Sequence, residues 1–144
     1  MAVKPIPDGY HTVTPYLVVP DVRKLLDFVT NAFDAEVKFQ MPGPAGGIAH
    51  AEFRIGNSMI MCGQSGEQHP PMPAMLYLYV TDVDALFAKA VAAGGEVIRP
   101  VTDQFYGDRS GGLKDSNGVQ WWVATHREDV PMEEMARRAA AACK

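Results

Sequence analysis

Three polar side chains occupy alternate positions of the segment 48–56, IAHAEFRIG, where they could carry out acid–base chemistry. Residues two apart on a strand share a face, so His50 and Glu52 would place a base beside a carboxylate. Arg54 continues this row and could hold an anionic group in its guanidinium fork. The alternative is a solvated strand face on which His50 is hydrogen-bonded and Arg54 pairs with Glu52. A metal site that adds His11 is a further alternative, although this spacing is not a metal-binding signature.

A second candidate is the segment 103–112, DQFYGDRSGG, which is predicted to be an aromatic and charged loop. As a lid, this loop would present Phe105, Tyr106 and Arg109 at the mouth of a binding site. The alternative is a turn braced by an ion pair between Asp108 and Arg109, with Phe105 in the core. Both interpretations stay open at this stage.

The elements that would position these side chains occur twice in the chain. Residues 17–37, LVVPDVRKLLDFVTNAFDAEV, superpose on residues 78–97, LYVTDVDALFAKAVAAGGEV, with an offset of 61 positions. Each copy predicts a strand, a capping aspartate (Asp21 or Asp82) and an amphipathic helix. Further strand patterns follow each helix, so each copy predicts a β-α-β-β-β module.

The chain is therefore predicted to be a single α+β domain over residues 1–144. Module one covers about 11–63, a proline-rich linker 64–74, module two about 75–126, and a C-terminal helix capped by Asp129 covers about 129–143. The predicted strands are 13–19, 36–41, 48–56, 58–63, 75–80, 96–101 and 119–125. Each sheet must bury one face under its helix, so the two modules would form a curved mixed sheet with a central cup.

Side chains of alternating parity would point into that cup. Val13, Leu17 and Val19 suit the helix side of the first strand, which leaves its other residues for the cup. The cup-facing set is then Thr14, Tyr16, Val18, His50, Glu52, Arg54, Met75, Tyr77, Tyr79, Gln120 and Trp122. Tyrosine, tryptophan and methionine with a few polar groups are typical of a small-molecule site. The alternative is that these residues fill a dimer interface or cover a convex face.

Composition narrows the classes of partner. Hydrophobic residues make up 47% of the chain and charged residues 21%, as in ordinary globular proteins. A net charge of −4 offers no basic face to nucleic acid. No apolar run approaches the roughly 20 residues of a membrane span, and the N-terminus does not resemble a signal peptide. Cys62 and Cys143 predict reduced thiols in a cytoplasmic protein rather than a disulfide.

The tandem modules, the openings VTPYLVVPDV and LYLYVTDVDALFAKAVAAGG, and the segment DQFYGDRSGGLKDSNG resemble the vicinal-oxygen-chelate superfamily over about residues 10–126. This group includes glyoxalase I, bleomycin-resistance proteins and extradiol dioxygenases, and the chain is most similar to its PhnB-like branch. In the metal-using members, each module supplies two ligands, usually His, Gln or Glu. The resemblance carries these positions onto Thr14, Met61, Met75 and Trp122, and the repeat offset agrees with this placement. None of the four is a credible ligand for a hard or borderline cation, so neither a metal nor a cofactor is expected.

The first functional expectation is a metal-independent protein that binds a flat apolar or aromatic ligand, similar to the sequestering members of the bleomycin-resistance group. Tyr16, Tyr77, Tyr79 and Trp122 would stack on this ligand, and His50, Glu52, Arg54 and Gln120 would orient it. Met61 and Met75 would line the same cup.

Three alternatives remain open. One is a glyoxalase-like lyase or isomerase with His50 as general base and Glu52 orienting it. Another is a metal-dependent member with atypical ligands. The third is an assembly or regulatory module whose cup is filled by its own side chains. A homodimer is expected in every case, because open sheets leave exposed edges.

Overall fold

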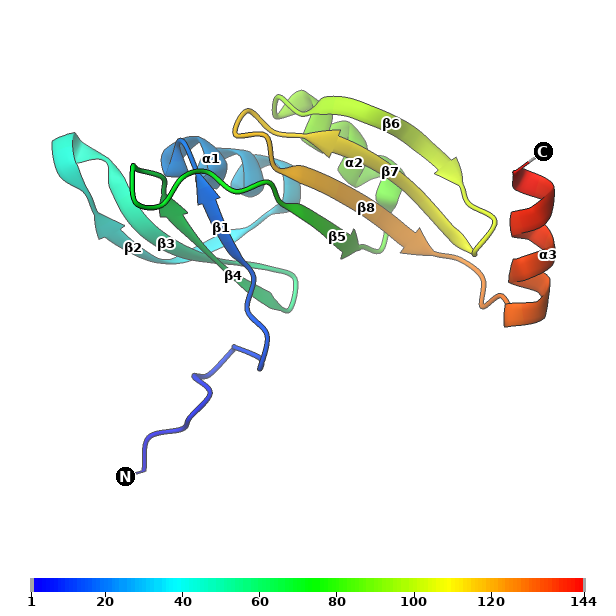
Figure 1. Ribbon diagram of the computed structural model, residues 1–144, viewed down its shortest axis with the longest axis horizontal. Coiled ribbons are helices and arrows are strands. Elements are labelled where there is room, and N and C mark those ends of the chain that lie inside the picture. The colour runs from blue at the N-terminus through cyan, green and yellow to red at the C-terminus, as the bar shows by residue number, and fades with distance from the viewer. Residues whose placement is uncertain (1, 144) are drawn as a thin grey trace.

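The computed structural model describes residues 2–143 and has the α+β architecture that the repeat predicts (Figure 1). Two four-stranded sheets form, one in each module. In both sheets the first strand of the module runs parallel to the last strand, and the remaining pairs are antiparallel. None of the helices within residues 2–143 is long and apolar enough to cross a membrane.

Module one has the strand order β1-β4-β3-β2. Its elements are β1 (Tyr16–Val19), α1 (Val22–Phe33), β2 (Glu36–Pro42), a short 3₁₀ turn (Pro44–Gly46), β3 (Ile48–Ile55) and β4 (Ser58–Gln64). Module two repeats this order as β5-β8-β7-β6. Its elements are β5 (Met75–Tyr79), α2 (Val83–Ala92), β6 (Glu96–Asp103), β7 (Asp108–Lys114) and β8 (Gln120–His126), and the helix α3 (Met132–Ala142) follows.

Both helices of the repeat begin at the predicted caps. The Asp21 side chain accepts a hydrogen bond from the Lys24 amide at 3.0 Å, and Asp82 accepts one from the Ala85 amide at 3.1 Å. These bonds satisfy amide groups that have no partner within the first turn of a helix. The apolar stripe of α1 then packs onto its own sheet.

The strand parity predicted from the sequence is confirmed on β1. Leu17 and Val19 on the helix side are 3% and 1% exposed, whereas Tyr16 on the opposite side of the strand is 50% exposed. The prediction for Val13 is wrong, since this residue is 81% exposed. The strand starts only after Pro15, because proline has no N–H group for the β ladder.

The prediction of a long loop at 103–112 is also wrong. The strand β6 continues to Asp103 and β7 begins at Asp108, so only a four-residue turn separates them. Glycine and serine have low β propensity, which hid this strand from sequence reasoning. Here the small residues are required by packing, because a Cβ on Gly111 would lie 2.9 Å from Phe87 and one on Gly112 would lie 2.6 Å from Trp122.

The C-terminal helix begins later than predicted. Pro131 is the residue before the first turn of α3, and no side chain caps this helix. Asp129, the predicted cap, instead bonds His126, with 2.7 Å between its Oδ1 and the imidazole Nε2. Figure 1 shows α3 standing at the far end of module two.

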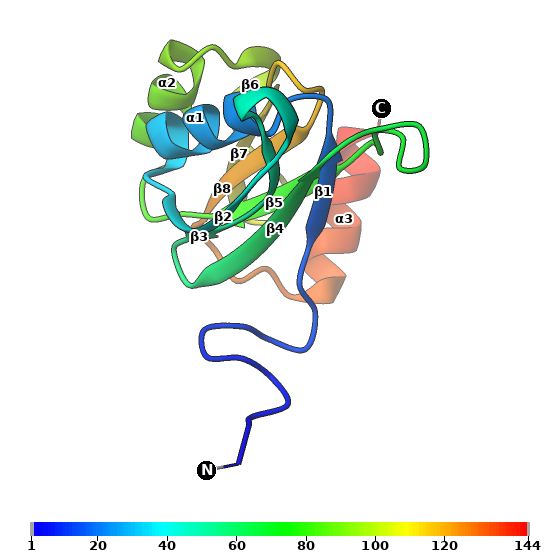
Figure 2. The ribbon, with the colours of Figure 1, turned by 90° about the vertical axis from the view of Figure 1, so that its left-hand side faces the viewer.

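The two modules meet through their helices and one turn. The helices α1 and α2 pack together on one side of the strands (Figure 2), and the rings of Phe33 and Trp121 lie 5.1 Å apart. The side-chain amide of Asn117, in the β7–β8 turn, accepts from the backbone N–H of Asp21 and donates to its carbonyl, both at 2.9 Å. This pair of bonds connects the two modules across 96 positions of sequence.

We expect Asn117→Ala to lower the free energy of unfolding by about 1–2 kcal/mol, because it removes two hydrogen bonds between the modules and leaves the half-buried N–H of Asp21 without a partner. Thermal and urea denaturation would measure the loss. The matched control is Asn57→Ala in the exposed β3–β4 turn, which should change stability by less than about 0.5 kcal/mol. Equal effects of the two substitutions would contradict a special role for Asn117.

Candidate functional site

The candidate site lies on what we call the open face, the side of each sheet that turns away from its helix. In module one, the open face carries Tyr16, Val18, Phe39, His50, Glu52, Arg54 and Met61. In module two, it carries Met75, Tyr77, Tyr79, Arg99, Asp108, Ser110, Gly112, Gln120 and Trp122. Most of the predicted cup residues thus share one face of their own module.

On module one, His50 is held between a phenol and a carboxylate. Its Nδ1 lies 3.0 Å from the Tyr16 hydroxyl, and its Nε2 lies 2.8 Å from Glu52 Oε2. Tyr10, in the segment before β1, donates its hydroxyl to the other Glu52 oxygen. The structure therefore brings His50 and Glu52 together as predicted, and both imidazole nitrogens are engaged.

Arg54 does not pair with Glu52. Its guanidinium lies 3.1 Å from Glu36 on the neighbouring strand β2. Beside it, the N-terminal segment and the sheet enclose a shallow hollow of about 450 Å³ lined by Asp8, Gly9, Tyr10, Lys38, Phe39, Glu52, Arg54 and Met59. The Phe39 ring in this hollow is 47% exposed, so module one offers an aromatic surface next to charged groups.

On module two, a buried carboxylate gathers three donors. Asp108 is 4% exposed and accepts hydrogen bonds from the hydroxyls of Tyr77 at 2.8 Å and Tyr79 at 2.9 Å. The imidazole Nδ1 of His126 lies 2.8 Å from its other oxygen, and Asp129 occupies the far side of that ring. The two tyrosine rings lie 5.2 Å apart with their hydroxyl ends fixed.

These contacts set the protonation states of the cluster. Burial raises the pKa of Asp108, but the hydrogen bonds from His126 and the two tyrosines outweigh it, so this pKa lies below its ordinary value. The bonds to Asp108 and Asp129 raise the pKa of His126. Burial and the bond to Asp108 raise the pKa of Tyr77, and the same bond raises that of Tyr79. The phenols therefore stay protonated and serve as fixed aromatic surfaces.

A row of four residues crosses the sheet of module two at one level. Tyr77 pairs in register with Trp122, Trp122 with Gly112, and Gly112 with Arg99. Because Gly112 has no side chain, the Trp122 indole can lie across it, and the Arg99 guanidinium carbon sits 4.7 Å from the centre of that ring system. The Trp122 Nε1 donates to Gln120 Oε1 at 3.1 Å.

Sequence reasoning missed Arg99 and the role of Asp108. The register of β6 shifts on both sides of Arg99, so counting alternate residues along this strand does not reveal its face. The sequence predicts Asp108 in a loop, and its pairing with Arg109 is only one of the two interpretations of that loop. Only the three-dimensional pairing of β5, β7 and β8 brings Asp108 to its actual donors.

The remaining predicted residues fall in different places. Arg109 lies on the helix side of module two, where Asp84 of α2 binds its Nε and Nη2 at 2.9 Å each. It does not reach the open face. Phe105 and Tyr106 lie in the β6–β7 turn with their rings 5.2 Å apart, and Phe105 is 38% exposed rather than in the core. Thr14 precedes β1 and donates to the His11 carbonyl at 3.4 Å.

The donor set at the four family-implied metal positions does not fit a divalent cation. Thr14 offers a hydroxyl, Met61 and Met75 offer thioethers, and Trp122 offers an indole N–H that is already donated to Gln120. Across residues 2–143, no cluster of three or more His, Cys, Asp or Glu side chains is arranged to hold a metal.

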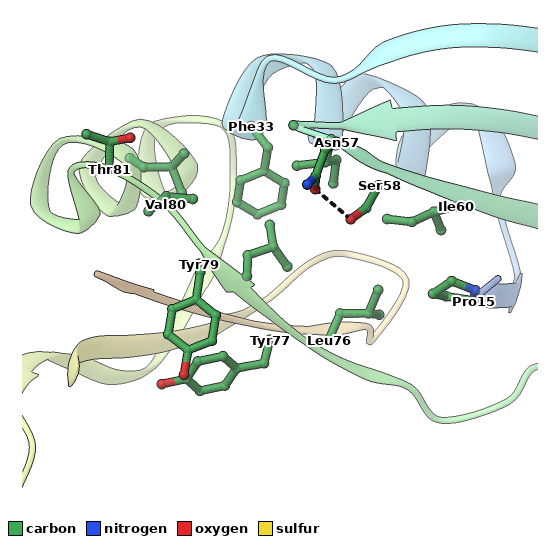
Figure 3. A pocket seen from close by; sticks show the side chains of 14 residues that line it. Pro15, Phe33, Asn57, Ser58, Ile60, Leu76, Tyr77, Tyr79, Val80 and Thr81 are labelled. Carbon is green, nitrogen blue, oxygen red and sulfur yellow. Dashed lines mark hydrogen bonds between the residues drawn. The ribbon is translucent and has the colours of Figure 1, made fainter. Parts of the chain in front are cut away.

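A further cavity lies between β5 and module one, at the edge of the open face. It is a groove of about 690 Å³ along the outer edge of β5, lined by apolar residues that include Phe33, Ile60 and Leu76. Figure 3 shows the rings of Tyr77 and Tyr79 on the opposite side of β5 from Phe33 and Ile60. Tyr77 and Tyr79 are also among the residues that line the groove, so the groove borders the tyrosine surface.

The cluster around Asp108 predicts a pH optimum of stability. The lowered pKa of Asp108 contributes stability above its ordinary value of 3.8, and this contribution is lost as the pH falls through the folded-state pKa. The raised pKa of His126 contributes stability below 6.5, and this contribution is lost as the pH rises through the folded-state value. Between these limits both contributions are present.

We expect Asp108→Asn to flatten the acid and alkaline limbs of a plot of Tm against pH. His126→Gln should remove the alkaline limb and weaken the acid limb, because the imidazole also helps to lower the pKa of Asp108. Each limb should amount to roughly 2 °C, because solvent screens the half-exposed imidazole. Calorimetry at several pH values would measure this, with the exposed His11→Gln as the control. An Asp108→Asn profile parallel to that of the unaltered protein would count against the cluster.

Comparison with known proteins gives the family. The sequence profile of the Glyoxalase/Bleomycin resistance protein/Dioxygenase superfamily matches residues 10–123, which includes both modules. An uncharacterized protein of Mycobacterium bovis is 36% identical over 136 residues, covering 85% of this chain and 88% of that protein. A Mycobacterium tuberculosis relative has the same identity and covers 85% and 79%, respectively.

Solved structures share the fold at low sequence identity. TioX from Micromonospora sp. ML1 is 24% identical with a TM-score of 0.71, covering 81% of this chain and 98% of TioX. A PhnB protein from Bacillus cereus has a TM-score of 0.63 at 22% identity, over 80% and 99% of the chains. The fosfomycin resistance protein FosX from Listeria monocytogenes, solved with Mn(II) and dihydroxypropylphosphonic acid, has a TM-score of 0.63 at 19% identity, over 90% and 97%. From the profile match and the mycobacterial relatives, the chain belongs to the Glyoxalase/Bleomycin resistance protein/Dioxygenase superfamily.

Proposed function

We propose that this protein binds a flat aromatic small molecule on its open face without the help of a metal ion. The observation that carries the proposal is a set of exposed rings whose polar ends are already satisfied. Tyr16 and Tyr79 are 50% and 64% exposed, yet their hydroxyls are bound to His50 and Asp108. Rings fixed in this way stack on a ligand with little loss of side-chain entropy.

The polar groups on the same face favour binding over catalysis, because their hydrogen-bonding atoms already have partners within the protein. Both nitrogens of His50 and both oxygens of Asp108 have partners within the protein. Sequestration of a ligand requires affinity and no reactive group. Among the structural neighbours, FosX was solved with Mn(II), whereas the residues at the family-implied metal positions of this chain are poor cation ligands.

We also propose that the protein is a homodimer. The strands β1 and β5 are outer strands of their sheets, and the open face leaves large apolar side chains such as Met75 exposed. Unpaired strand edges and exposed apolar side chains favour association with a second copy.

A screen of flat aromatic compounds by native mass spectrometry tests the ligand and the dimer in one spectrum. We expect a dimer that takes up one class of aromatic compound. Tyr79→Ala and Trp122→Ala should each weaken binding about tenfold, because each removes one stacking surface. Met132→Ala in α3 is the control, since it truncates an exposed apolar side chain that is not part of the open face. Failure of every aromatic compound to bind, or unchanged affinity in Trp122→Ala, would overturn the proposal.

A second candidate function is a lyase or isomerase. The connected side chains of Glu52, His50 and Tyr16 favour it, because a carboxylate that orients an imidazole is a common arrangement for proton transfer. In this case Glu52 would position His50, and His50 would remove a proton from the bound substrate.

For this candidate, we expect His50→Ala to retain ligand affinity within about threefold and to lose at least about 100-fold in turnover of any compound found to react. Isothermal titration and product analysis on the same preparations would separate the two quantities. Equal turnover in His50→Ala and the unaltered protein would eliminate His50 as the base.

A further inference from the structure

Arg99 is a cation without an anionic partner. Within residues 2–143, no carboxylate lies within 4.0 Å of its guanidinium, whereas Arg54, Arg109, Arg137 and Arg138 all form ion pairs. One Arg99 nitrogen donates to Ser110 Oγ at 2.8 Å. Its Nε is buried and has no hydrogen-bond partner among the described residues.

A buried donor on a charged group is unfavourable unless an acceptor satisfies it. The packing around Arg99 nevertheless holds the guanidinium in place, since Trp122 lies beneath it and Ser110 beside it. Gly112 makes this arrangement possible, because any Cβ there would collide with the indole. A cation kept in a fixed position without an internal anion is suited to an anion from outside the chain.

The position of Arg99 relates this charge to the aromatic surface. The Trp122 indole lies across Gly112 of β7, and adjacent strands are about 4.8 Å apart, so the guanidinium over this indole is about two strand spacings from β5, which carries Tyr77. Gln120 fixes the indole through its side-chain oxygen, which leaves its amide N–H groups available as further donors. Stacking surface and positive charge thus lie side by side.

We propose that the ligand of the open face is an aromatic carboxylate, whose ring stacks beside Trp122 and Tyr77 while its carboxylate pairs with Arg99. This inference rests on the proposed function and adds the charge of the ligand to it. A planar carboxylate matches the guanidinium fork in shape and charge. The arginine supplies positive charge in a module whose family-implied metal positions, Met75 and Trp122, are poor ligands for a cation.

The test compares 2-naphthoate with its neutral analogue 2-naphthamide by isothermal titration calorimetry at pH 7.5. We expect the unaltered protein to bind naphthoate at least about tenfold more tightly than naphthamide. Arg99→Met should abolish this preference and leave naphthamide affinity within about twofold, since methionine still packs on the indole. Raising the salt concentration should weaken the binding of naphthoate only.

Two further variants keep the test decisive. Arg137→Met removes the same charge from an exposed position on α3 and should retain the preference for naphthoate. Arg99→Lys keeps the charge without the fork and should retain part of it, which covers the case in which Arg99→Met does not fold by circular dichroism.

The possible failures are distinguishable. If both compounds bind equally, or if Arg99→Met retains the preference, the carboxylate inference is overturned and aromatic binding stands. If neither compound binds the unaltered protein while another flat aromatic compound from the screen does, this inference falls and the proposed function stands; if no aromatic compound binds, both fall.

Discussion

The alternation of side chains along β8 is the constraint on which the rest of the structure depends. Trp121 points to the helix side, where it is fully buried and packs on Phe33 of module one. Trp122 points to the open face, where its indole forms a cation–π contact with the guanidinium of Arg99. Because strand side chains alternate strictly, a shift of one residue would exchange the two indoles. The contact between the modules and the candidate site are therefore fixed by the same register.

Two buried aspartates hold that register at opposite ends of the sheet. Asp115 accepts from the Trp121 indole at 2.9 Å and from the backbone amides of Asn117 and Val119 at 2.8 and 3.0 Å, which closes the β7–β8 turn. Burial outweighs these bonds and raises the pKa of Asp115. At the other end, donors that include the imidazole of His126 lower the pKa of Asp108. Asp115 in the β7–β8 turn is therefore bound by donors that carry no charge, whereas Asp108 beside the two tyrosines is bound by an imidazole that can be protonated.

Sequence reasoning succeeded where a pattern is local. The helix caps, the pairing of His50 with Glu52 and the outward face of Tyr77 follow from spacings of two to four residues. Each depends only on the period of a strand or a helix, which neighbouring residues determine.

Sequence reasoning failed where distant residues override local preference. The strand β7 contains small residues of low β propensity, and it forms because Phe87 and Trp122 leave no room for larger ones. The face of Arg99 depends on irregular pairing in β6. Arg109 is a residue type that often binds ligands, but the register of β7 places it on the helix side, where Asp84, 25 positions away, binds its guanidinium. These contacts join segments that a single sequence does not place together.

The close fit of Gly112 and Trp122 also bears on how such a chain can evolve. A larger residue at position 112 would collide with the indole, whose atoms lie 2.6 Å from the position of a Cβ. A smaller, chelating residue at position 122 would instead leave a gap above the glycine, and unfilled space in a packed layer lowers stability. Either change alone is unfavourable, so the two positions are epistatic and must change together. This dependence disfavours the stepwise introduction of a metal ligand at position 122.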